Sequence, residues 1–357
     1  MKENWKKLLL VVGSIIFTLL IGELLLQLNF RIKNGQWLWE SNQFKVDYII
    51  PTDDRRQYTL RPDYYDVVQN MPINKRGERT TEQPLSLEDT QNVIVCLGDS
   101  VPFGFGVGNN DTYPFFLAKT LAERGFNYYV INGGIPSYNL RQSFDRLKFD
   151  VLKHIEIKDI KVVTIQAAND ISLMLHYREN WTPDLTWADV RFNIYPIPFS
   201  NYLATSYYIS QLISQPRGSD NDFDFNMVFE QLTVIIEEEI REIQEISPDI
   251  NIILLPVNPF YYQTTNQDEN TNLQLWENNS KYLKNREQLN LDIYKVLFEI
   301  SKKCDNVFFL DIKSEMDLKD RNDFYKDYIH LSPEGNKFQA ELMAEFLIEN
   351  GLIKSEN

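Results

Sequence analysis

The sequence is poor in the residues that build disulfide and metal frameworks. Only two cysteines, Cys96 and Cys304, and three histidines occur among 357 residues. Two cysteines cannot form the disulfide framework of a small secreted scaffold. Three histidines leave little material for a histidine-rich metal site. We therefore expect no metal and no other cofactor.

Basic charge is also in short supply. Lys and Arg total 36 against 51 Asp and Glu, which gives a formal net charge of -15. Because such a balance repels phosphate backbones, nucleic acid is not an expected partner. The remaining composition, 43% hydrophobic and 13% aromatic, is ordinary for a globular chain and excludes a disordered or multi-span membrane protein.

Long apolar runs are confined to the N-terminus. Three lysines within the first seven residues precede an apolar stretch from Leu8 to Leu28, in which Glu23 is the only charge. As a helix this stretch spans about 30 Å, the hydrocarbon thickness of a bilayer. The positive flank predicts a cytoplasmic N-terminus, and no small-residue cleavage site follows. We predict a single-pass membrane anchor over residues 1–30 with the rest extracytoplasmic; the alternative is an apolar helix in a soluble core.

Residues 31–90 are polar, aromatic and poorly periodic, with a turn expected at Asn74-Lys75-Arg76-Gly77. They are interpreted as a stalk or N-terminal extension that becomes ordered against the main domain.

Five short apolar runs then alternate with helical patterns. The predicted strands are 93–97, 128–131, 162–165, 252–255 and 307–310; the predicted helices are 111–124, 139–153, 227–246, 289–303 and 333–349. This alternation predicts an α/β fold, a flavodoxin-like three-layer α/β/α arrangement around a five-stranded parallel sheet. The domain would cover residues 91–352, with insertions near 180–220 and 260–285.

Polar residues follow four of these strands. The blocks are Gly98-Asp99-Ser100, Asn132 to Asn139, Ala167-Ala168-Asn169-Asp170 and Asp327-Tyr328-Ile329-His330. In a parallel sheet such loops meet at the carboxyl edge. Together they offer what acyl transfer needs: a serine to attack, a histidine to accept its proton, an acid to orient the histidine, and N–H groups and an Asn amide for an oxyanion.

In order and placement the four blocks resemble the SGNH (GDSL) family of hydrolases, over roughly residues 92–350. The resemblance implies that Ser100 is the nucleophile, His330 the general base and Asp327 its orienting acid. It also implies an oxyanion hole formed by the backbone N–H of Ser100, Gly134 and the Asn169 amide.

Two positions depart from the family pattern. Ala167 stands where the third block usually opens with Gly, and Ser137 replaces a frequent Gly of the second block. Neither change removes a proton-transfer group. An α/β-hydrolase elbow would need Gly-x-Ser-x-Gly, and Pro102 stands in place of the second glycine.

Plainer structural interpretations remain for these residues. Ser100 or Asp99 can cap a helix, Asn169 and Asp170 can be turn residues, and His330 can be a hydrogen-bonded loop histidine. The glycine-rich segment 104–108 is interpreted as a lip of the active site rather than a phosphate cradle.

The aromatic insertion from Trp181 to Gln215 allows two interpretations. It binds an acyl chain or a sugar ring, or it packs a small core of its own.

The sequence therefore predicts a membrane-anchored, extracytoplasmic serine hydrolase that cleaves acyl esters through an acyl-enzyme on Ser100. Its expected partners are an acyl-ester small molecule, a lipid or an acylated glycan, and the membrane. Two alternatives stay open: an O-acyltransferase or deacetylase acting on cell-envelope polysaccharide, and a non-catalytic binding protein on the same fold.

Overall fold

The computed structural model describes residues 2–35, 37–38, 48–66, 70–167, 169–177, 180–188, 203–213, 225–256, 280–317, 323–327 and 329–355. The chain forms two compact units. One contains Met1–Asp47 and Ala188–Asn221, and the other contains Tyr48–Trp187 and Asp222–Asn357. Most of the two predicted insertions, over 189–202, 214–224 and 257–279, lies outside the described residues.

The larger unit is built on a five-stranded sheet whose neighbouring strands are all parallel, in the order β6-β5-β7-β8-β9. The strands are β5 (Val93–Gly98), β6 (Tyr129–Gly134), β7 (Ile160–Gln166), β8 (Asn251–Leu254) and β9 (Val307–Phe309). All six residues of β5 are buried, as expected for a central strand with both faces covered. The predicted α/β fold is confirmed, and each strand lies where the apolar runs predict it.

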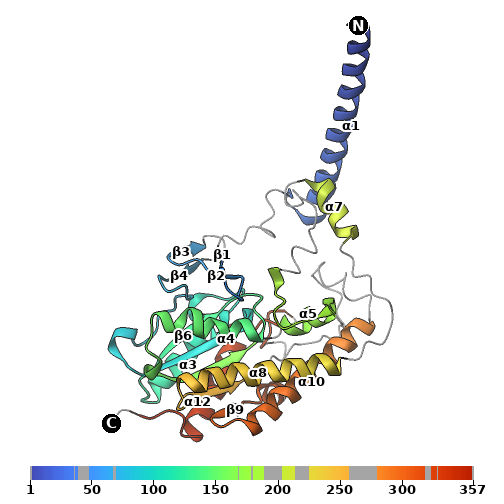
Figure 1. The fold of residues 1–357 in the computed structure, drawn as a ribbon. Coiled ribbons are helices and arrows are strands. Elements are labelled where there is room, and N and C mark those ends of the chain that lie inside the picture. Colours follow the sequence, from blue (N-terminus) through green and yellow to red (C-terminus); the bar gives the residue numbers. More distant parts are fainter. Residues whose placement is uncertain are drawn as a thin grey trace. The chain divides into compact units, whose positions relative to one another are not determined.

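Helices cover both faces of this sheet (Figure 1). Helices α3 (Tyr113–Glu123) and α12 (Pro333–Glu349) pack together, and α3 contacts β6. Helix α4 (Leu140–Phe149) lies against β5 and β7 and contacts α8 (Asn226–Ile246), while α10 (Ser280–Lys303) contacts α8, β8 and β9.

The helical periodicity explains which side of a helix is buried. From Phe229, the buried apolar residues of α8 recur every three or four positions, at Leu232, Ile236, Ile240 and Ile243, and Val228 lies beside the first of them. Helix α4 is shorter than predicted, because it gives way to a 3₁₀ turn at Val151–Lys153. Among the described residues, four α-helices were not predicted: α2 (Ser100–Phe103), α5 (Asn169–Tyr177), α7 (Ala204–Ile213) and α11 (Ile312–Asp317).

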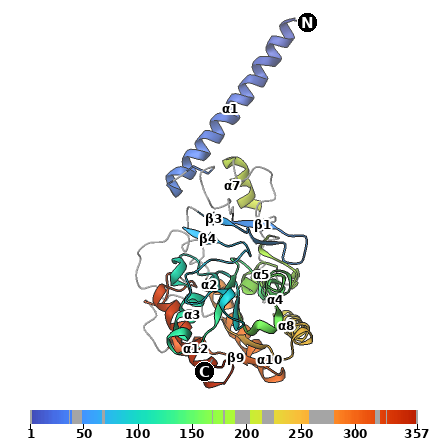
Figure 2. The same cartoon turned by 90° about the vertical axis from the view of Figure 1, so that its left-hand side faces the viewer.

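The segment before the sheet forms two short antiparallel hairpins. They are β1 (Ile49–Pro51) with β2 (Tyr58–Leu60), and β3 (Tyr64–Asp66) with β4 (Met71–Ile73). These strands lie together at one end of the larger unit (Figures 1 and 2).

Hydrogen bonds connect this segment to the loop that follows β6. Tyr58 Oη donates to the carbonyl of Pro136 at 3.2 Å, and Tyr138 Oη donates to the carbonyl of Tyr58 at 2.5 Å. The hairpin of β1 and β2 is therefore hydrogen-bonded to the loop at the carboxyl end of β6.

A buried charge network reinforces this connection. Arg56, 2% exposed, and Arg146, 1% exposed, both pair with the carboxylate of Asp150, which also accepts the Thr59 hydroxyl at 2.8 Å. Burial opposes ionisation of Asp150, but the two guanidinium groups outweigh it and lower its pKa to about 2. Truncating Asp150 would take from the buried Arg146 the carboxylate with which it pairs.

The smaller unit contains α1 (Lys2–Asn34) and α7 (Ala204–Ile213). Among the described residues, α1 is the one helix long and apolar enough to cross a membrane. Trp5–Lys33 reaches a mean hydropathy of 2.5, and none of that apolar window is buried.

Candidate active site

Strand β5 ends in a turn that requires glycine. Gly98 has a φ of +143°, and a Cβ at this position would lie 1.8 Å from the carbonyl oxygen of Gln166 on β7. The chain then enters α2 at Ser100. Asp99 caps this helix, because its Oδ1 accepts the N–H of Val101 at 2.9 Å. The Ser100 hydroxyl is therefore not used as the cap of the helix that it begins.

The structure brings Ser100, His330 and Asp327 together from opposite ends of the sequence. His330 Nε2 lies 2.9 Å from Ser100 Oγ, and His330 Nδ1 lies 2.7 Å from Asp327 Oδ2. Because a carboxylate only accepts, Nδ1 carries the proton and Nε2 is left to accept from the serine hydroxyl. The three side chains form a continuous hydrogen-bonded chain.

Asp327 is held by the turn that carries the histidine. Its Oδ1 accepts the backbone N–H groups of Ile329 at 2.9 Å and of His330 at 2.8 Å. Burial opposes the ionisation of Asp327. The hydrogen bond and the charge interaction with the His330 side chain, together with the two backbone N–H groups, outweigh it and lower the pKa of Asp327 below its ordinary value. The acid is thus a carboxylate at neutral pH.

Asn169, the first residue of α5, lies at the same carboxyl edge of the sheet, which we call the rim. Its Nδ2 donates to Asp99 Oδ2 and to the carbonyl of Tyr138, each at 3.1 Å, and its Oδ1 accepts the indole N–H of Trp187 at 2.9 Å. The amide therefore has a defined orientation, with its NH₂ group toward the nucleophile turn. Trp187 was considered only as part of an aromatic insertion, and sequence reasoning missed this contact.

Gly134 lies at the end of β6, against the backbone of the short nucleophile helix α2 and its cap. A Cβ here would be 2.3 Å from the backbone nitrogen of Phe103 and 2.9 Å from the carbonyl of Asp99. This close approach explains the glycine. Its N–H already donates to Asn132 Oδ1, at 3.3 Å, so a role in binding an oxyanion stays a prediction.

The structure describes the backbone or burial of the two residues, Ser137 and Ala167, that depart from the family pattern. Ser137 has a φ of +69°, the left-handed conformation that glycine adopts most easily. Ala167 is 3% exposed at the end of β7.

The segment 104–108 passes beside the histidine. The Phe105 ring lies 5.0 Å from the His330 ring, centroid to centroid. Arg79, 4% exposed, donates to the carbonyls of Phe103 at 2.8 Å, Gly104 at 2.5 Å and Val107 at 2.6 Å. Burial lowers the pKa of Arg79 to about 10. Arg79 was not predicted, because backbone carbonyls as acceptors leave no pattern in the sequence.

Asp170 is a second buried acid near the site. It is 1% exposed, and its Oδ2 accepts the N–H of Leu140 at the start of α4, at 2.8 Å. Burial raises its pKa to about 7, and the nearby charge of Asp99 acts in the same direction. Asp170 links α5 to α4 and is not hydrogen-bonded to the serine or the histidine.

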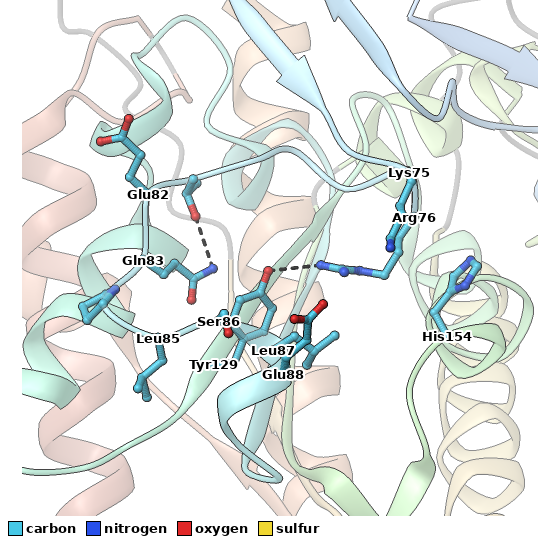
Figure 3. Close-up of a pocket in the computed structure, with 12 residues that line it drawn as sticks. Lys75, Arg76, Glu82, Gln83, Leu85, Ser86, Leu87, Glu88, Tyr129 and His154 are labelled. Atoms are coloured by element: carbon cyan, nitrogen blue, oxygen red, sulfur yellow. Dashed lines mark hydrogen bonds between the residues drawn. The ribbon is translucent and has the colours of Figure 1, made fainter.

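A hollow of about 910 Å³ lies away from this rim. Its lining includes Arg76, Gln83, His154 and Tyr129, the first residue of β6, which places it at the amino end of that strand (Figure 3). The Arg76 guanidinium donates to Tyr129 Oη at 3.1 Å. None of the predicted site residues lines this hollow, so its size does not mark it as the site of the chemistry.

Comparisons with known proteins place the chain in context. The model of the GDSL-like lipase/acylhydrolase family matches residues 96–338. No curated protein sequence matches the chain.

Several solved structures are similar in fold. A Clostridium thermocellum family 3 carbohydrate esterase is 15% identical, with 74% of this chain and 99% of that chain covered and a TM-score of 0.43. The acetyl xylan esterase AlAXEase is 15% identical, with 71% and 99% covered and a TM-score of 0.41. TesA is 12% identical, with 73% and 100% covered and a TM-score of 0.41. At such identities and TM-scores, none of these likenesses bears on the substrate.

Proposed function

Because the chain belongs to the GDSL-like lipase/acylhydrolase family and is an ester hydrolase, we propose that it is a membrane-anchored serine hydrolase that cleaves carboxylic esters through an acyl-enzyme on Ser100. One observation carries this proposal. The hydroxyl of Ser100, the imidazole of His330 and the carboxylate of Asp327 are hydrogen-bonded in series, over 2.9 and 2.7 Å.

The first step is attack on the ester carbonyl. Ser100 Oγ bonds to the carbonyl carbon while its proton moves to His330 Nε2, as the short distance between them allows. Asp327 keeps Nδ1 protonated and stabilises the imidazolium that forms. The imidazolium then gives its proton to the departing alcohol, and an acyl-serine remains.

The developing oxyanion would be bound at the start of α2. The N–H of Ser100 belongs to the first turn of that helix, where N–H groups have no partner within the helix. The Asn169 amide would supply a second donor. At 3.1 Å its present bonds to Asp99 and Tyr138 are not short, and an oxyanion would compete with them for the amide hydrogens.

The acyl-serine can be released in two ways. Water activated by His330 gives the free acid, which is hydrolysis. A sugar hydroxyl in the place of water gives an acylated glycan, and the same machinery is then an O-acyltransferase acting on cell-envelope polysaccharide. A deacetylase would use the hydrolytic route on such a glycan.

The anchor is the second part of the proposal. Helix α1 has the length and hydropathy of a membrane span, and its apolar window is exposed rather than packed in a core. The lysines before it favour a cytoplasmic N-terminus, with the hydrolase extracytoplasmic.

The test uses the full chain in detergent micelles. Nitrophenyl esters from acetyl to dodecanoyl measure turnover and chain-length preference, with Ser100→Ala and His330→Gln as inactive controls. Products are then analysed with an ester donor and a polysaccharide acceptor both present. Free acid without acylated glycan supports the hydrolase, and acylated glycan supports the transferase. Absence of any turnover or acyl-enzyme in the wild type would refute the catalytic proposal and favour a binding protein.

A further inference from the structure

Helix α7 is attached to α1 by the one carboxylate of the apolar run. Glu23 Oε1 accepts the N–H of Ala204 at 2.6 Å, and its Oε2 accepts the N–H of Thr205 at 3.0 Å and the Thr205 hydroxyl at 2.7 Å. Ala204 and Thr205 open α7, where N–H groups lack partners within the helix. The carboxylate therefore caps α7 and faces the positive end of its dipole.

More contacts join the two helices. Asn29 Nδ2 donates to Tyr208 Oη at 2.8 Å. Phe30, Leu38 and Ala204, each at most 1% exposed, form a small core against which Tyr208 packs. The end of α1, residues 37–38 and α7 thus form one packed assembly, which we call the anchor platform.

The position of Glu23 along α1 sets the level of this platform. From Leu8, the first residue after the flanking lysines, to Glu23 the helix rises about 22 Å, so Glu23 lies toward the far boundary of a hydrocarbon core of roughly 30 Å. A charged residue costs least at the boundary of that core, and here it is also fully paired. Further on, the Arg31 guanidinium lies 4.7 Å above the Trp37 ring, a pairing of residue types typical of the membrane–water interface.

Apolar exposure continues from the span onto the platform. Leu24 is 53% exposed and Leu28 37% exposed on α1, while Leu203 is 43% and Ile209 42% exposed at α7. Because these exposed apolar side chains lie on or beside a helix that packs against the end of the candidate span, lipid is the occupant that the arrangement favours.

We propose that α7 lies in the membrane–water interface on the extracytoplasmic side, held there by Glu23, and contacts lipid through Leu203 and Ile209. This inference rests on the proposed anchor. It assigns α7, which belongs to the aromatic insertion from Trp181 to Gln215, a role in membrane binding rather than one limited to the substrate or to a core of its own.

The test places single fluorescent labels on the full chain. A Cys304→Ser background leaves only Cys96, which is fully buried. An NBD label is placed at Ile209→Cys, at Leu19→Cys in the span, or at Val234→Cys on α8. Val234 is 53% exposed and apolar, and lies in the other unit, which makes it the matched control. The labelled chains are reconstituted in phosphatidylcholine vesicles containing doxyl lipids.

We expect blue-shifted emission and several-fold stronger quenching at 209 than at 234, with quenching at 19 as well. Quenching at 19 with 209 indistinguishable from 234 would overturn the inference and leave the anchor intact. No quenching at 19 would overturn the anchor, and the inference with it.

A second variant tests the link itself. Glu23→Ala should abolish the excess quenching at 209 and leave that at 19 unchanged, whereas Gln27→Ala, which removes one contact to Glu23 and keeps the cap, should preserve both. Unchanged quenching at 209 in Glu23→Ala would show that this carboxylate does not hold α7.

Discussion

Replacing Gly98 with alanine perturbs the turn that presents the nucleophile. The added methyl would meet the carbonyl oxygen of Gln166 at 1.8 Å, its carbonyl carbon at 2.7 Å and Pro102 Cγ at 2.8 Å. Two of these atoms belong to the backbone of β7, so no side-chain rotation relieves the overlap. Strands β5 and β7 must separate, or the turn must change.

Two contributions add to the loss of folding stability in Gly98→Ala. A φ of +143° costs an L-residue about 1–3 kcal/mol, and the overlap costs about 1–3 kcal/mol more. The sum, about 2–6 kcal/mol, is a large part of a typical free energy of unfolding. At roughly 2–4 °C per kcal/mol, we expect the midpoint of thermal unfolding to fall by at least about 4 °C. Esterase activity should fall as well, because Ser100 follows the turn by two residues.

Gly125→Ala is the matched control. Gly125 also has a positive φ, +84°, but a Cβ there meets nothing within 4 Å, so only the backbone term of about 1–2 kcal/mol applies. The assay is thermal unfolding of the full chain in detergent, followed by near-ultraviolet circular dichroism, with nitrophenyl ester turnover in parallel. Gly98→Ala as stable and active as Gly125→Ala would refute the reasoning.

Three further predictions concern the site. Asn169→Ala should lower kcat about 10²–10³-fold with the fold intact, and a loss below a few-fold would remove Asn169 from the oxyanion hole. Trp187→Phe removes one hydrogen bond, about 0.5–1.5 kcal/mol, and should lower kcat roughly 2–10-fold with KM unchanged. Trp181→Phe should change neither, because the buried indole N–H of Trp181 has no hydrogen-bond partner in the part of the chain that the structure describes. Because burial raises the pKa of Asp170 from 3.8 to about 7, the folded chain retains a proton that the unfolded chain releases. The free energy of unfolding of the wild type should therefore fall as pH rises from about 4 to about 7. Asp170→Asn lacks this titration, so its stability relative to the wild type should grow between pH 5 and pH 8 in unfolding experiments. A difference that stays constant with pH would contradict the raised pKa of Asp170.

The sheet was predictable because each of its strands is a short apolar run that can be recognised from the local sequence. A run such as Val93 to Leu97 is apolar on both faces, and the glycines, serine and acids after such runs fall at the carboxyl edge by the rule for parallel sheets. The placement of Ser100, His330 and Asp327 on one rim follows from that rule.

The contacts that hold the catalytic loops in place were not predictable in the same way. Arg79 binds backbone carbonyls 24 to 28 residues away, and such acceptors carry no residue identity. Trp187 reaches Asn169 through one indole N–H, in a segment whose aromatics suggested only packing or substrate binding. Both contacts depend on how distant segments meet, which periodicity and composition do not encode.

Covalent labelling of the full chain with a fluorophosphonate tests the central claim most directly. We expect one adduct, located by mass spectrometry on the peptide that contains Ser100. It should be abolished in Ser100→Ala and strongly slowed in His330→Gln, which loses the base. An unlabelled wild type, or an adduct that persists in Ser100→Ala, would contradict that claim.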